Sequence, residues 1–181
     1  MRIELAVPED LTHVLEMRAE ASEWLGKLGT DQWSRPFPDE QSQSDRLLAS
    51  ILNGETWMVR DGDSTVATIT INEYANPLLW TEAERADSAR YVHKMTVRRS
   101  HSGSGLGGRL LDWAGGRAAA EGAKWLRLDA WTTNTALHAY YMRQGFEHVR
   151  SVVRPDYPSG ALFQRPALFG SDLSSDLQTA I

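Results

Sequence analysis

A group of closely spaced glycines is the stretch of this sequence best suited to hold a ligand. Gly103, Gly105, Gly107 and Gly108 stand between a β-type segment ending at Val97 and a helical segment rich in leucine and alanine. Glycine lets the backbone approach a ligand closely, and the N–H groups at the start of a helix favour bound phosphate. The spacing therefore predicts a pyrophosphate site, with a flexible glycine loop as the alternative on these residues alone.

The same glycines also satisfy the pattern G-x-G-x-x-G, which is typical of dinucleotide-binding βαβ units. Asp129 follows 26 residues after Gly103, where such a unit places an acidic residue. However, five polar residues separate Val97 from Gly103, whereas the dinucleotide motif turns tightly off its strand. Too few elements follow for a doubly wound sheet, so an NAD-binding protein is the less favoured hypothesis.

The elements that must position this loop follow from hydrophobic periodicity and from glycine and proline breaks. We expect an α/β fold with a mixed, mostly antiparallel sheet of six to seven strands and about four helices. The sheet should be antiparallel at first and parallel around the glycine loop. The segment 73–89 is predicted to be irregular. Helices are predicted at 8–28, 40–53, 105–121 and 134–144, and strands at 2–7, 56–60, 65–71, 91–97, 125–130, 146–153 and 161–165.

Composition narrows the classes of function. The 181 residues include no cysteine, which excludes disulfides and thiolate chemistry, and the five histidines lack metal-ligand spacing. No apolar run reaches the roughly 20 residues of a membrane span, and the N-terminus does not resemble a signal peptide. We therefore expect a cytoplasmic protein without a metal, with one domain over 1–168 and a flexible tail over 169–181.

Charge is distributed unevenly along the chain. The net charge is −5, but residues 1–55 carry −6 and residues 90–154 carry +7. The acidic balance disfavours a nucleic-acid partner. The basic middle suits a small polyanion and the acidic first third suits a cationic partner, with an ordinary solvated surface as the alternative.

The glycine segment resembles motif A of the GCN5-related N-acetyltransferase (GNAT) superfamily. In that motif a strand ending in valine is followed by polar residues and then by Arg/Gln-x-x-Gly-x-Gly/Ala, a register occupied here by 102–107. Ser102 departs from the pattern because it replaces the leading Arg or Gln. Motif B is matched by Asn134, Tyr141 and Gly145-Phe146. The resemblance covers residues 2–165, is strongest from 91 to 146, and implies central strands that splay apart at the cofactor site.

The resemblance implies acetyl-CoA as the acyl donor. Strand backbone at 95–97 would hold the pantetheine and acetyl end, and loop amides would hold the pyrophosphate. The amide of Met95 would stabilise the oxyanion that forms during transfer. Asn134 would contact the pantetheine side, or only cap its helix. The cofactor-binding residues implied in this way are Met95, Thr96, Val97, Ser102, Gly103, Ser104, Gly105, Leu106, Gly107, Gly108 and Asn134.

The resemblance also implies catalytic roles. Tyr141 would donate a proton to the departing thiolate, with core packing as its alternative. Many relatives carry a glutamate on the fourth strand where this chain has Tyr91. His93, two residues along the same face, is therefore our candidate base, and a histidine packed in the sheet is the alternative.

The acceptor side is assigned to aromatic and acidic residues. Trp33, Trp131 and Asp129 are the candidate substrate-binding residues, and Trp80 is also expected to lie in an accessible loop. The predicted activity is transfer of the acetyl group to a primary amine of a small cationic acceptor. A catalytically inactive CoA-binding regulatory module is the main alternative. A homodimer is common in the family.

Overall fold

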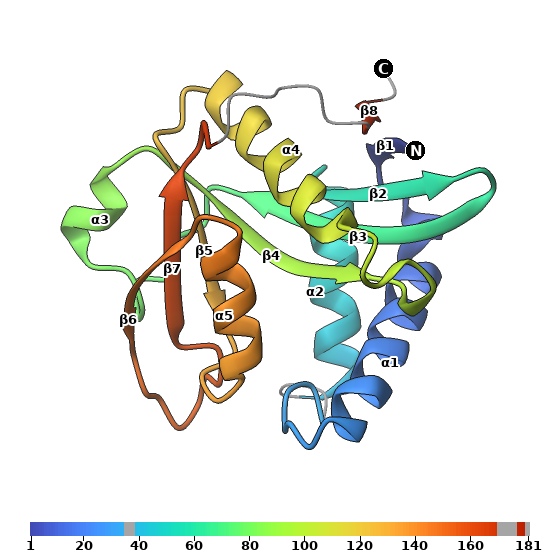
Figure 1. Cartoon of the computed structure of the whole chain (residues 1–181), viewed down its shortest axis with the longest axis horizontal. Coiled ribbons are helices and arrows are strands. Elements are labelled where there is room, and N and C mark those ends of the chain that lie inside the picture. Colours follow the sequence, from blue (N-terminus) through green and yellow to red (C-terminus); the bar gives the residue numbers. More distant parts are fainter. Residues whose placement is uncertain (35–38, 170–176, 180–181) are drawn as a thin grey trace. The chain divides into compact units, whose positions relative to one another are not determined.

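The computed structural model describes residues 1–34, 39–169 and 177–179 (Figure 1). These residues form two compact units. The first contains residues 1–70 and 94–107 with the described part of 176–181, and the second contains 71–93 with the described part of 108–175. The strands β3 (Ser64–Asn72) and β4 (Ala89–Val97) and the helix α4 (Leu106–Ala120) each continue from one unit into the other.

The first unit is a small antiparallel sheet with two helices. β2 (Thr56–Asp61) pairs with β1 (Arg2–Leu5) on one side and with β3 on the other, and the Asp-Gly turn between β2 and β3 makes the predicted hairpin. The helices are α1 (Leu11–Lys27), entered through a 3-10 turn at Pro8–Asp10, and α2 (Glu40–Leu52). Their apolar faces form a core with β2, made of Ala6, Val14, Met17, Leu47, Ile51 and Met58.

Three of the eleven acidic residues among the first 55 form ion pairs with described arginines inside this unit. Asp10 accepts a hydrogen bond from Arg60 Nη2 at 2.6 Å, and Glu4 accepts one from Arg60 Nε at 3.0 Å. Glu16 lies 3.3 Å from Arg98. These pairs weaken the argument that the acidic first third exists to attract a cationic partner.

The second unit contains the parallel strand pair. β4 pairs with β5 (Trp125–Ala130) in parallel, β5 with β7 (Ala161–Pro166) antiparallel, and β7 with β6 (Glu147–Ser151) antiparallel. The helices α3 (Glu82–Ala86) and α5 (Thr135–Arg143) and most of α4 belong to it. The sheet is thus mixed and mostly antiparallel, as predicted, with every predicted helix and strand present.

Two predictions need amendment, and the prediction of a flexible tail concerns residues that are only partly described. The segment 73–89 is not wholly irregular, because a capping box between Thr81 and Glu84 starts the helix α3. Trp80 is not accessible: it is 1% exposed and packs edge-on against Tyr91 at 5.6 Å. Of the predicted flexible tail, 170–176 and 180–181 lie outside the described residues. Leu177 is buried, and a two-residue strand β8 (Gln178–Thr179) pairs in parallel with β1.

The pairing of β4 with β5 is short. Within the second unit it runs from Ala89↔Trp125 to Val92↔Leu128 and includes neither His93 nor Asp129, the next residue of each strand. Lys94, which follows, has a positive φ of 53°. A side-chain-bearing residue rarely adopts this left-handed conformation, so the backbone at Lys94 departs from regular strand geometry. Within the second unit, the pairing of β4 with β5 therefore ends before His93, and the separation of these strands at 95–97 that the resemblance implies stays a prediction.

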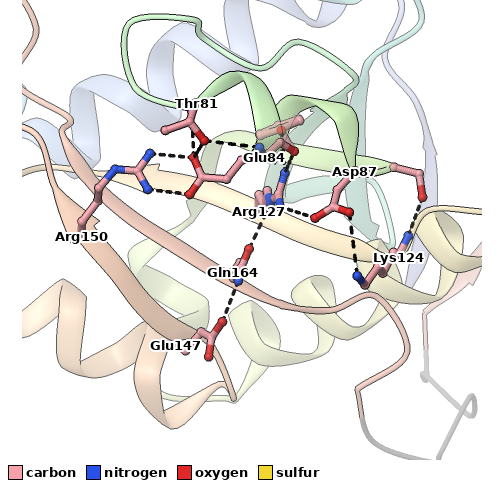
Figure 2. Close-up of polar contacts among 10 residues, drawn as sticks. Thr81, Glu84, Asp87, Lys124, Arg127, Glu147, Arg150 and Gln164 are labelled. Atoms are coloured by element: carbon pink, nitrogen blue, oxygen red, sulfur yellow. Dashed lines mark hydrogen bonds and ion pairs between the residues drawn. The ribbon is translucent and has the colours of Figure 1, made fainter.

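A buried arginine organises the polar contacts of the second unit (Figure 2). Arg127 is 1% exposed and donates to the carbonyl of Glu84, to Gln164 and to Asp87. Glu84 in turn accepts two hydrogen bonds from the guanidinium of Arg150, at 2.5 and 2.7 Å. These bonds favour the ionised carboxylate and lower the pKa of Glu84 to about 2.

We expect the Glu84→Gln variant to lose about 1 kcal/mol of unfolding free energy at pH 6, because it loses its ion pair with Arg150. Because the folded-state pKa of Glu84 is depressed, its contribution is present above pH 4.5 and is lost as the pH falls toward 2. Urea unfolding at pH 6 and pH 3 should therefore show a smaller difference from the wild type at pH 3. Glu82→Gln, an exposed residue of the same helix, is the control; an equal loss at both pH values would contradict this account.

Candidate functional site

The glycine loop of the first unit has the conformation that a backbone anion site requires. Gly103 and Gly105 have φ values of 79° and 76°, which side-chain-bearing residues rarely adopt. The segment 102–105 is exposed, and no atom lies within 4 Å of a Cβ built on Gly103. Ser104 Oγ donates to the carbonyl of His101 at 2.6 Å and accepts from the N–H of Leu106 at 3.4 Å, which joins the loop to the start of α4. These residues fit a pyrophosphate group.

The replacement of the motif's leading Arg or Gln by Ser102 is offset by an arginine three residues earlier. Arg99 Nη1 donates to Ser102 Oγ at 3.0 Å. The guanidinium of Arg99 also lies 4.0 Å from the ring centroid of Trp24, and the backbone N–H of Arg99 donates to Glu20. Stacking on an indole favours a fixed guanidinium. A cation is therefore present beside the loop although the motif position holds serine.

The strand residues expected at the acetyl end also lie in the first unit. Met95 and Val97 are half-buried and Thr96 is buried. Lys94 directly precedes them with its left-handed backbone. Of the remaining loop residues, Leu106 is fully buried, and Gly107 and Gly108 are half-buried in the first turn of α4. A Cβ on Gly108 would lie 2.6 Å from Gln144 Oε1, so this glycine also leaves room for a side chain of the second unit.

Tyr141 is a buried phenol in the second unit. Its ring packs against Phe146 and Phe163, each at 5.8 Å between centroids. Among the described residues, its hydroxyl forms no hydrogen bond. Burial raises the pKa of Tyr141 well above 10, which keeps it neutral at physiological pH. Complete proton transfer to a thiolate is then more uphill than for a free phenol, so the position of the donor counts most.

Asn134 and Trp131 have structural partners at the start of α5. The Asn134 side chain accepts from the N–H of Leu137 at 3.0 Å, which is the helix-capping role weighed as its alternative. The carbonyl of Trp131 accepts a hydrogen bond from His138 Nε2 at 2.8 Å, and its side chain is half-buried. A contact of either residue with a ligand remains a prediction.

His93 and Asp129 lie together where β4 and β5 cease to pair. His93 Nε2 is 3.1 Å from Asn72 Oδ1, and this oxygen also accepts the N–H of Tyr74. The other ring nitrogen of His93, Nδ1, lies 3.9 Å from Asp129 Oδ1. A proton taken up at Nδ1 would be stabilised by the carboxylate of Asp129.

Burial raises the pKa of Asp129 to about 6, although a hydrogen bond at 3.0 Å from the hydroxyl of Tyr157 works in the opposite direction. Tyr91, which replaces the glutamate of many relatives, is 3% exposed, and its hydroxyl accepts from Arg127 Nη1 at 3.2 Å. It belongs to the core, whereas His93 and Asp129 bring two titratable groups together.

Trp33 belongs to the first unit, beside a cation. The guanidinium of Arg18 lies 4.4 Å from the ring centroid of Trp33, and Ser22 Oγ donates to the Trp33 carbonyl at 2.7 Å. Its φ of 59° is left-handed. The structure thus adds Arg18, Lys94 and Tyr157 to the residues expected from sequence. No motif includes them, and their roles depend on contacts distant in sequence.

Comparison with known proteins agrees with this geometry. The family model described as Acetyltransferase (GNAT) family matches residues 18–146. A protein of Bacillus subtilis (strain 168) named uncharacterized N-acetyltransferase YesJ is 28% identical over 146 residues, covering 78% of this chain and 79% of that protein. A GNAT-family acetyltransferase of Listeria monocytogenes 4b F2365 has a TM-score of 0.73 at 22% identity, over 91% of this chain and 93% of that one.

Two further solved structures contain a ligand. The PaiA N-acetyltransferase of Thermoplasma acidophilum, in complex with coenzyme A, has a TM-score of 0.69 at 14% identity and covers 91% of this chain and 98% of its own. YncA of Salmonella typhimurium, described as a putative acetyltransferase with its cofactor acetyl-CoA, has a TM-score of 0.64 at 16% identity. The match covers 97% of this chain and 98% of that one.

The chain belongs to the GNAT acetyltransferase family. No helix within residues 1–34, 39–169 and 177–179 has the length and apolar character of a membrane span. Within the same described ranges, no three His, Asp or Glu side chains gather as a metal-binding group.

The raised pKa of Asp129 predicts an unusual pH dependence of stability. Because the folded state binds this proton more tightly, the wild type should lose stability as the pH rises from 3.8 to about 6. Asp129→Asn removes this loss, so its stability relative to the wild type should increase by roughly 2–3 kcal/mol between pH 4 and pH 7 in urea unfolding. Asp156→Asn is the control, because Arg154 lowers the pKa of this exposed carboxyl. A constant difference for Asp129→Asn would show that its pKa is ordinary.

Proposed function

We propose that this protein transfers the acetyl group of acetyl-CoA directly to the primary amine of a small acceptor. The observation that carries the proposal is the exposed loop at Gly103–Gly105, with two left-handed glycines that lead into α4, in a chain of the GNAT family. The relatives solved with coenzyme A and acetyl-CoA support the choice of donor. Direct transfer needs no cysteine, and the chain has none.

Acetyl-CoA supplies an acetyl group activated as a thioester. The amides of 103–108 would bind its pyrophosphate, with the Arg99 guanidinium beside Ser102 as an additional positive charge. The backbone at 95–97 would bind the pantetheine arm and orient the acetyl group. The N–H of Met95 would donate a hydrogen bond to the acetyl oxygen, where negative charge develops during transfer.

The chain's titratable groups would move the two protons that the reaction requires. An alkyl ammonium with a pKa near 10.4 must lose a proton before its nitrogen can attack. His93 would accept this proton, directly or through water, and the neighbouring Asp129 would stabilise the resulting imidazolium. Tyr141 would donate a hydrogen bond and then a proton to the departing sulfur.

Calorimetric titration tests the donor site. Wild-type protein should bind acetyl-CoA at one site per chain and should not bind NAD. Gly103→Ala should weaken acetyl-CoA binding about tenfold, since a methyl group forces the loop out of its left-handed conformation. Gly62→Ala is the matched control: its φ is 58°, its Cβ also meets nothing within 4 Å, and it lies in the β2–β3 turn. NAD binding without acetyl-CoA binding would contradict the proposal.

Kinetics of Tyr141→Phe test the proton donor. We expect kcat to fall about 100-fold or more if Tyr141 acts as a general acid, while acetyl-CoA affinity stays near that of the wild type. Tyr140→Phe, its half-buried neighbour, controls for the loss of a hydroxyl in the same helix. An unchanged kcat under conditions where chemistry limits the rate would remove Tyr141 from the mechanism. Acetyl-CoA binding without turnover on any amine would instead indicate a regulatory module.

A further inference from the structure

Three cationic side chains of the first unit lie within electrostatic reach of one another. They come from three elements: Arg18 from α1, Arg46 from α2 and Lys94 from β4. Lys94 Nζ donates to Ser50 Oγ at 2.8 Å and to the Arg46 carbonyl at 3.1 Å. Both of these partners are neutral, so the ammonium is held in place without being neutralised by them.

Arg18 is held in a similar way, by an aromatic ring. Its guanidinium lies 4.4 Å from the centroid of Trp33. Among the described residues, no carboxylate lies within ion-pair distance of Arg18 or Lys94. By contrast, other arginines, including Arg60, Arg98 and Arg150, have a carboxylate within ion-pair distance. The two half-buried cations therefore differ from the ordinary arginines of this protein.

Repulsion between these cations contributes to the lowered pKa values of Arg18 and Lys94. Burial and the charge of Arg46 lower the pKa of Arg18 to about 10. Burial, Arg46 and Arg18 lower the pKa of Lys94 to about 8, although the carboxylate of Glu55 opposes this effect. Burying like charges together costs free energy, and a bound anion would offset that cost.

Backbone conformation gives an independent reason to treat this cluster as a site. Among the described residues, Trp33 and Lys94 are the two non-glycine residues with positive φ, at 59° and 53°. Both belong to the cluster: Trp33 stacks with Arg18, and Arg18 acts on Lys94. Strained backbone of this kind is retained where the position of a side chain is important, and it is concentrated at ligand sites.

We propose that Arg18 and Lys94 bind an anionic group of the acceptor, so that the substrate is an amine that also carries a carboxylate, such as an amino acid or a close derivative. This inference rests on the proposed acetyltransferase function. Lys94 directly precedes Met95, which is assigned to the acetyl end of the donor, and stands nine residues before Gly103 in the pyrophosphate loop. The cluster is therefore assigned to the acceptor rather than to the phosphates of the donor. The acceptor is then zwitterionic rather than simply cationic.

A binding experiment tests the site without relying on turnover. Saturation-transfer NMR should detect N-acetylglycine, which carries a carboxylate, and should give at least a tenfold weaker response for the neutral N-acetylglycinamide. Lys94→Met and Arg18→Met should each weaken N-acetylglycine binding about tenfold or more. Lys94→Arg keeps the positive charge and should therefore retain part of the affinity for N-acetylglycine. Lys27→Met, an exposed position of α1, is the matched control and should bind as the wild type does.

The acceptor kinetics and the pH profile complete the test. Amino acids should be acetylated with a KM at least tenfold lower than that of the amides or decarboxylated amines with the same side chain. Lys94→Met should remove this difference and leave acetyl-CoA affinity unchanged. N-acetylglycine binding should weaken as the pH rises above 8, because the ammonium of Lys94 loses its proton, and Lys94→Arg should remove that dependence.

The outcomes separate the two proposals. Equal binding of the acid and the amide, or unchanged binding in both methionine variants, overturns the acceptor site even where amines are acetylated. If Lys94→Met weakened acetyl-CoA binding and left N-acetylglycine binding unchanged, the cationic cluster would be assigned to the phosphates of the donor. That result would also overturn the acceptor site. Absence of acetyl-CoA binding in the wild type overturns the proposed function, whereas selective binding of N-acetylglycine would still support the anion site.

Discussion

The strand β4 pairs with β5 in its first half and supplies residues of the candidate site in its second half. The rest of the candidate site depends on this change along the strand. Its first half pairs in parallel with β5 and buries Tyr91 and Val92 in the core. At His93 the pairing with β5 has ended, and at Lys94 the backbone turns left-handed. In a regular strand, successive side chains would point to opposite faces of the sheet. The interruption instead gives consecutive residues separate roles: a candidate base, a candidate anion ligand and the backbone assigned to the donor.

The local partners of the charged residues are more informative about the site than the net charge of the chain. Three of the eleven acidic residues of the first third, Glu4, Asp10 and Glu16, pair with Arg60 or Arg98. Arg127 and Arg150 form the polar framework of the second unit. Burial shifts the pKa values of Lys94 and Asp129 toward neutrality. Groups that titrate near neutral pH suit a reaction in which protons must be taken and given.

Sequence was sufficient wherever a residue type determines local conformation. Glycines at 103 and 105 specify left-handed backbone in the loop, and apolar periodicity identified the helices and strands that flank it. It failed for α3, where a capping box between Thr81 and Glu84 lies in a polar segment. It also gave no indication of the positive φ of Lys94, because a lysine in a strand pattern does not indicate left-handed backbone. Asp129 was named from sequence, but its raised pKa depends on burial and on Tyr157, 28 residues away.

The order of the two units along the chain has a consequence for synthesis. The first unit is assembled from residues 1–70, 94–107 and a C-terminal segment, so most of the second unit is translated before the first can be completed. One edge of β1 pairs with β2, whereas the other pairs with β8 at Gln178–Thr179. While the chain is growing on the ribosome, that outer edge of β1 lacks its neighbour, and an unpaired edge can recruit other nascent chains. The outer edge of β1 therefore gains its neighbour only after the described residues of the second unit have been synthesised.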